Sequence, residues 1–144
     1  MDREEVLRTI RKVFGGGGPR DREQALRDVN TALGNQRLGS TLRTALDDAL
    51  RTAVRRGILE NTGGTLRLLA RRLEDYDRAF LKEQFLAALG RSWVEREEAI
   101  YRWVRWMGYG RTTDGMFDIG RSLINGLVRT GELETEGRER VRRR

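Results

Sequence analysis

The side chains best suited to chemistry in this sequence are arginines and one asparagine near its C-terminal end. Arg121 and Asn125 are one helical turn apart, and Arg129 follows one turn later. Arg and Asn make paired hydrogen bonds to the edges of guanine and adenine. The spacing is therefore typical of a helix that enters a DNA groove. The same residues also fit a helix face that is buried against a protein partner.

The sequence offers little to catalysis. It contains no His and no Cys, which removes thiol nucleophiles, zinc sites and most nucleophile–base pairs. The neighbouring carboxylates Asp47-Asp48 and Glu97-Glu98 point about 100° apart on a helix, so neither pair forms an acid–base dyad. The run Gly15–Gly18 lacks the ending of a phosphate-binding loop and follows a helix rather than a strand. We expect a protein that is not an enzyme and holds no metal or cofactor.

The charge favours a polyanionic partner. The chain has a net charge of +7. Residues 1–72 carry 15 basic and 9 acidic side chains, and residues 73–144 carry 14 and 13. This balance suits nucleic acid, although solvated surface charges would produce it equally well. No apolar run approaches the ~20 residues of a membrane span, and the N-terminus is unlike a signal peptide. We therefore expect a cytoplasmic protein with no membrane partner.

Hydrophobic periodicity predicts three helices in each half of the chain. The expected helices are residues 2–14, 21–33, 41–56, 75–89, 95–107 and 114–130. Gly15–Gly18 and Pro19 should end the first helix, and Ser40 should cap the third. Ile58–Glu60 and Thr65–Leu68 bracket a Gly-Gly turn and predict a hairpin. A shorter, more polar hairpin is expected over residues 132–143.

The two halves are related by one constant shift along the sequence. This shift superposes identical residues at many punctuating positions, including Gly34 and Gly108, Arg37 and Arg111, Arg55 and Arg129, Gly57 and Gly131, and Gly63 and Gly137. A fixed period that spans whole modules indicates a tandem duplication. We expect a mainly α protein with small β-hairpin wings, made of two winged helix-turn-helix units, residues 1–72 and 73–144, that pack together.

The third helices of the two units should differ in function. The first should present a charge-paired, solvated face because Asp47 is one turn from both Arg43 and Arg51. The second has Arg121 and Asn125 where the first has Asp47 and Arg51. Its two glycines, Gly120 and Gly126, suggest close approach by another backbone, such as the first unit. The candidate DNA contacts are Arg37, Arg43, Arg51, Arg55, Arg67, Arg111, Arg121, Asn125, Arg129 and Arg138.

Four segments carry a resemblance to a known group of proteins. They are RDREQALRDV, GSTLRTALDDALRTAVRRGILEN, DYDRAFLKEQFLAALGRSWVEREEAI and RSLINGLVRTGELE. They resemble the uncharacterised, winged-helix-like C-terminal domains of bacterial superfamily I helicase-like or restriction-associated proteins. The resemblance implies an accessory module in bacterial DNA processing or defence. It implies no ATPase activity because no helicase motif is present.

These observations lead to two functional hypotheses. The first is a DNA-binding module that holds double-stranded DNA mainly through phosphate contacts. The second is a docking module for a helicase or nuclease without direct DNA contact. The docking hypothesis predicts an exposed apolar patch around Trp106, Tyr109 and Phe117.

Overall fold

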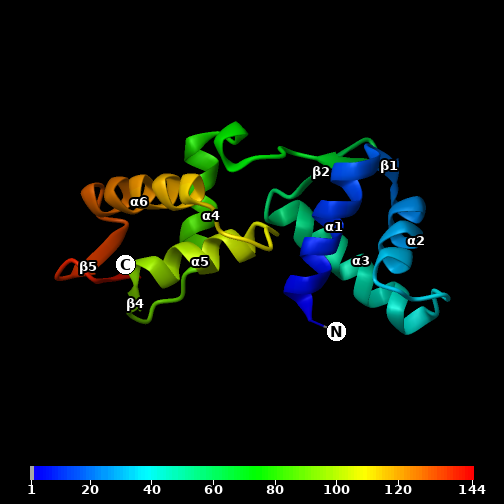
Figure 1. Ribbon diagram of the computed structural model, residues 1–144, viewed down its shortest axis with the longest axis horizontal. Helices are drawn as coiled ribbons and strands as arrows, with labels where there is room; N and C mark the ends of the chain where they lie inside the picture. Colours follow the sequence, from blue (N-terminus) through cyan, green and yellow to red (C-terminus); the bar gives the residue numbers. More distant parts are fainter. Residues whose placement is uncertain (1) are drawn as a thin grey trace. The chain divides into compact units, whose positions relative to one another are not determined.

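The protein is mainly α-helical, with two small antiparallel sheets (Figure 1). A computed structural model describes residues 2–144. The chain divides into two compact units between Arg71 and Arg72, one residue before the boundary expected from the sequence. No helix within the described residues is long and apolar enough to cross a lipid bilayer.

The first unit consists of three helices and a three-stranded sheet. Its elements are α1 (Arg3–Gly17), β1 (Arg20–Asp21), α2 (Arg22–Ala32), α3 (Ser40–Arg55), β2 (Leu59–Thr62) and β3 (Thr65–Leu68). The strand order is β1-β3-β2. The expected two-stranded hairpin is therefore incomplete, because Arg20 pairs with Leu66 and Asp21 with Thr65. A two-residue strand carries no apolar alternation, so periodicity could not reveal it.

The second unit repeats this topology. Its elements are the short 3-10 helix η1 (Leu73–Asp75), α4 (Arg78–Ala88), β4 (Val94–Glu95), α5 (Arg96–Trp106), α6 (Asp114–Arg129), β5 (Leu133–Glu136) and β6 (Arg140–Arg143). The strand order is β4-β6-β5. β4 and β5 lie where the sequence shift places β1 and β2. β6 begins one residue later than the shift of β3 predicts, because the turn before it is longer. The second hairpin is thus not shorter than the first, because both have strands of four residues.

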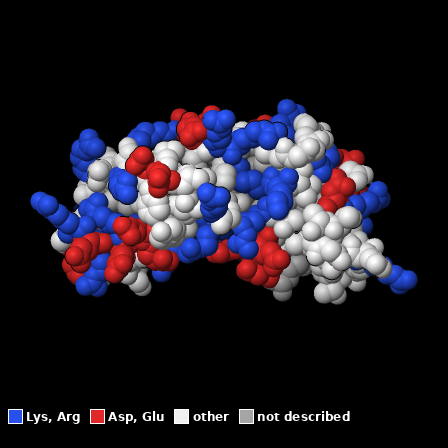
Figure 2. Space-filling view, viewed as in Figure 1, with Lys and Arg blue, Asp and Glu red and all other residues white. Residues whose placement is uncertain are grey.

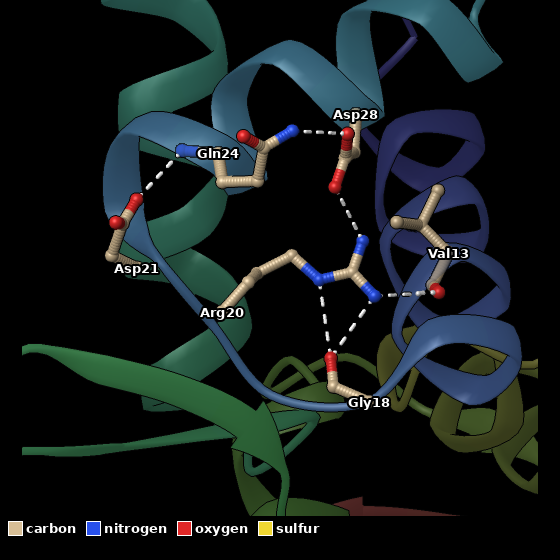
Figure 3. Close-up of polar contacts among 6 residues, drawn as sticks. All are labelled: Val13, Gly18, Arg20, Asp21, Gln24 and Asp28. Carbon is tan, nitrogen blue, oxygen red and sulfur yellow. Dashed lines mark hydrogen bonds and ion pairs between the residues drawn. The ribbon is translucent and has the colours of Figure 1, made fainter.

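The glycine run does not end the first helix where the sequence suggested. α1 continues through Gly17, and Gly18 ends it with a φ of +83°. The Arg20 guanidinium covers this end (Figure 3), donating to the carbonyls of Val13 at 3.3 Å and Gly18 at 3.0 Å. A Cβ at Gly17 would lie 2.2 Å from Arg20 Nη2. The glycine leaves room for this arginine, which Asp28 holds at 2.7 Å.

Side chains cap the N-terminal ends of most of the α-helices. The Asp2 and Asp21 side chains accept hydrogen bonds from backbone amides in the first turns of α1 and α2. The expected cap at Ser40 is wrong, because Ser40 is already helical and Gly39 occupies the cap position without a side-chain bond. In the second unit, Asp77 caps α4, which therefore begins later than expected.

Each unit has its own hydrophobic core. In the first, the inner faces of α1, α2 and α3 enclose Phe14, Leu26 and Leu46, with Leu66 of β3. In the second, Phe85 of α4 and Trp103 of α5 pack with ring centroids 5.4 Å apart. These cores fix the third helix and the hairpin within each unit.

The glycines of α6 serve packing within the second unit. A Cβ at Gly120 would lie 2.8 Å from Ile100 Cγ1 on α5, and a Cβ at Gly126 would contact Lys82 on α4 at 3.4 Å. The atoms nearest to these glycines are thus side chains of the second unit's own helices, rather than the backbone expected from the sequence.

Candidate nucleic-acid interface

The ten candidate side chains lie on corresponding parts of the two units. Arg43 is half-buried and the other nine are exposed. In the first unit they occupy the α2–α3 turn (Arg37), α3 (Arg43, Arg51, Arg55) and β3 (Arg67). In the second unit they occupy the α5–α6 turn (Arg111), α6 (Arg121, Asn125, Arg129) and the β5–β6 turn (Arg138).

The outward face of α3 is neutralised by ion pairs. Asp47 is bonded to Arg22 of α2 and lies 3.3 Å from Arg51. The hydrogen bond from Arg22, assisted by its charge, holds the pKa of Asp47 below its usual value. Asp48 pairs with Arg3 at 3.1 Å. A phosphate approaching this face would meet two carboxylates whose positive partners are already engaged.

Arg43 is also engaged. Both of its terminal nitrogens bond the Glu23 carboxylate, and this pairing lowers the pKa of Glu23 and raises the pKa of Arg43. The geometry is the two-pronged arrangement that arginine makes with carboxylates. Binding a phosphate through Arg43 would require displacement of Glu23.

Arg55 and Arg67, the other first-unit candidates on α3 and β3, have polar contacts of their own. Arg55 donates to Thr52 Oγ1 at 3.1 Å. Thr52 is fully buried, so the expectation of a wholly solvated outward face fails at this position. Arg67 lies 3.8 Å from Glu60 on the neighbouring strand, which is a weak, solvent-exposed pair.

The face of α6 separates its acids from its cations along the helix. Arg121, Asn125 and Arg129 are exposed at intervals of one turn. Arg121 pairs with Asp118 at 2.9 Å, and Arg96 of α5 donates to Asn125 Oδ1 at 3.4 Å. This stripe has its two acids, Asp114 and Asp118, before its two cations along the helix, in contrast to the interleaved acids and bases of α3.

A groove runs beside this stripe. It has a volume of about 620 Å³ and is lined by Glu95, Arg96, Glu97, Ile100, Arg121, Asn125, Arg138 and Glu139. Arg96 and Glu97 were not anticipated from the sequence as groove residues. They correspond by the internal repeat to Arg22 and Glu23, which line a groove at the same place in the first unit, but neither groove could be located without the packing of the helices.

The two grooves differ in the residues that α3 and α6 contribute. Asp47 and Arg51 line the first groove, and Arg121 and Asn125 occupy the corresponding positions in the second. The exchange replaces a carboxylate with a guanidinium and a cation with an amide. The second groove therefore offers bidentate donors without a carboxylate from the third helix.

Four candidate arginines remain available for a ligand. Within residues 2–144, Arg37, Arg111, Arg129 and Arg138 form no ion pair with an acidic side chain. Arg37 and Arg111 lie at matching positions before the third helices. On the face drawn in Figure 2, basic and acidic side chains lie side by side in several places. An arginine without an acidic partner is a better phosphate ligand than one already paired.

The basic C-terminal segment is held within the fold. Arg142 belongs to β6, donates to Glu134 at 2.7 Å and lies over the Trp93 ring, 4.5 Å from its centroid. Arg144 also bonds Glu134, and the two arginines lower the pKa of that carboxyl. These cations are partly used in fastening the hairpin.

No protein-family model, curated protein or solved structure matches this chain. The candidate interface is therefore supported by its residues and their geometry alone. Among the described residues, no group of three or more acidic side chains is arranged to hold a metal ion.

The patch expected by the docking hypothesis is largely closed. Trp106, Tyr109 and Phe117 are all half-buried, and Trp106 donates its indole N–H to Gln84 Oε1 at 2.8 Å. The exposed large apolar side chains of residues 2–144 are instead Leu69 and Tyr101, at 40% and 37% exposure. In the second unit, the exposed ring is therefore that of Tyr101 on α5.

Proposed function

We propose that the protein is a pair of winged-helix units that binds double-stranded DNA without catalysing a reaction. The order of three helices followed by an antiparallel hairpin supports this assignment in each unit. In helix-turn-helix proteins, the last of these helices enters the major groove. The first strand, β1 or β4, joins the hairpin to the helical part of its unit and so fixes the wing.

The second unit makes the principal contact. The observation that carries this proposal is the exposed row Arg121, Asn125 and Arg129 on α6, beside a groove that also includes Arg138. Arg111, Arg129 and Arg138 contact phosphates, because they have no acidic partner to displace. Arg121 and Asn125 face the bases, for which guanidinium and amide groups are suited.

The first unit plays a lesser part in this proposal. Among its candidate cations within the described residues, Arg37 alone has neither an ion pair nor a side-chain hydrogen bond, while Arg43, Arg51 and Arg67 lie beside carboxylates. We place the role of the protein in bacterial DNA processing or defence in the cytoplasm, as the sequence resemblance implies. A neighbouring helicase or nuclease would then supply the chemistry.

The test is fluorescence anisotropy of a labelled 20-bp duplex at a series of salt concentrations. The logarithm of the affinity falls with the logarithm of salt by ~0.9 for each phosphate contact. We expect Arg129→Ala combined with Arg138→Ala to reduce this slope by about two contacts and to weaken binding at every salt concentration. The matched control is Arg51→Ala in the first unit, which removes an exposed arginine already paired with Asp47.

Three results would count against the proposal. If Arg51→Ala weakened binding more than the double variant, the first unit would be the contact surface. An unchanged salt slope in the double variant would place the phosphates elsewhere. Absence of binding at low salt would reject nucleic acid as the partner and favour the docking hypothesis.

A further inference from the structure

An aromatic pair with an arginine beside it lies on the surface of the second unit. The rings of Tyr101 on α5 and Phe117 on α6 meet edge to face, with centroids 5.0 Å apart and planes 85° apart. The Arg121 guanidinium lies over the Phe117 ring, 5.5 Å from its centroid. Tyr101 is exposed and Phe117 half-buried, so the Tyr101 ring is the part of the cluster that solvent reaches most freely.

The fold does not require this cluster. In the first unit, the residues at the positions of Tyr101, Phe117 and Arg121 are Arg27, Arg43 and Asp47. That unit has the same topology with no aromatic ring at either position. An exposed tyrosine ring packed on a half-buried phenylalanine therefore calls for an explanation beyond folding, and a binding function supplies one.

The charge around the cluster favours a neutral, planar ligand over a phosphate. Arg121 is already paired with Asp118 at 2.9 Å, so its charge is largely balanced. The exposed Tyr101 ring, packed on Phe117, can stack on a flat group. An unpaired nucleobase has this shape, and every base presents a π-face to an aromatic side chain.

We propose that the Tyr101 ring, packed on Phe117, stacks an unpaired base, so that the second unit prefers duplex DNA that continues into a single strand. This inference rests on the proposed DNA-binding function and specifies the form of DNA that is bound. Arg129 and Arg138 hold the duplex backbone, while the cluster takes the first bases that have lost their partners. Duplex ends and junctions of this kind arise wherever strands are separated or cut.

The experiment compares three labelled probes that share one 20-bp duplex. The first is blunt, the second carries a five-nucleotide thymine extension, and the third carries an abasic extension of the same length. The abasic extension retains the phosphates but has no bases to stack. The wild-type protein should bind the thymine extension at least about fivefold more tightly than the abasic one, given the usual strength of base–aromatic stacking.

The variant is Tyr101→Leu combined with Phe117→Leu, which keeps apolar volume and removes both rings. Thermal unfolding verifies that it folds. It should lose the preference for thymine over abasic extension and keep its affinity for the blunt duplex. The matched control, Arg27→Leu at the position of Tyr101 in the first unit, should keep the preference.

Each contrary result has a distinct meaning. Equal binding of the thymine and abasic extensions overturns the stacking inference and leaves duplex binding intact. A preference that survives in the leucine variant places the stacked base elsewhere and also overturns it, leaving the aromatic pair to a protein partner. Failure to bind any of the three probes rejects the proposed function and this inference with it.

Discussion

Single residues explain where this chain departs from simple sequence rules. Glycine is expected to break a helix, yet α1 includes Gly15, Gly16 and Gly17. The reason is a contact with Arg20, which follows the loop after the helix and turns back onto it. The same arginine packs over Phe14, 4.6 Å from the ring centroid. Such a contact depends on three-dimensional proximity, and helix propensity alone could not reveal it.

Neighbouring glycines in α1 should respond oppositely to alanine. Gly17→Ala places a methyl group against the anchored Arg20 guanidinium, so we expect a loss of about 1 kcal/mol of stability as the arginine's hydrogen bonds are disturbed. Gly16→Ala meets no atom within 4 Å and should raise the stability by up to about 1 kcal/mol. Urea denaturation followed by circular dichroism measures both. Equal effects of the two substitutions would contradict the role assigned to Arg20.

The ion pair of Asp47 should make the stability depend on pH. Because Arg22 lowers the pKa of Asp47 in the folded state, the pair stabilises the fold above the unfolded value of about 3.9. This contribution is lost as the pH falls through the lower folded pKa. The Asp47→Asn variant should therefore lose less stability than the wild type between pH 6 and pH 3 in urea denaturation. Parallel curves for the two proteins would mean that the pair adds nothing.

At the scale of elements, periodicity predicted the helices well and the strands less completely. The expected helices at residues 95–107 and 114–130 match α5 and α6 to within a residue at each end. β1 and β4 were missed because each is very short and pairs with a strand far along the chain. Among the site residues, Arg96 and Tyr101 were not predicted as contacts, because their roles depend on how α5 lies against α6.

The packing of α5 on α6 gives a prediction for this helix pair. Gly120→Ala would place Cβ 2.8 Å from the buried Ile100 side chain, so we expect a loss of about 1–3 kcal/mol through overpacking. Gly115→Ala, in the first turn of the same helix, has only Thr113 Oγ1 nearby at 3.9 Å and serves as the control. Chemical denaturation compares them. If the stability losses of Gly120→Ala and Ile100→Ala simply add in the double variant, the contact has been wrongly assigned.

At the scale of the whole molecule, the two units repeat one topology with different surfaces. The constant shift between the halves was visible in the sequence and recurs in the order of the elements. The pairing of charges was only partly visible, because Asp47–Arg51 lies within one helix whereas Arg22–Asp47 and Arg3–Asp48 join different helices. Net charge alone would therefore overestimate how many arginines of the first unit are available to a ligand. On α3, Arg43 and Arg51 are engaged by acids.

The most direct test of the central claim is an amide NMR titration of the full chain with a 20-bp duplex. If the second unit makes the principal contact, the largest shift changes should fall on Arg111, Asn125, Arg129 and Arg138. The amides around Asp47 and Arg51 should change little, because the ion pairs of α3 remain in place. Changes concentrated on α3, with α6 and the β5–β6 turn unaffected, would contradict the account.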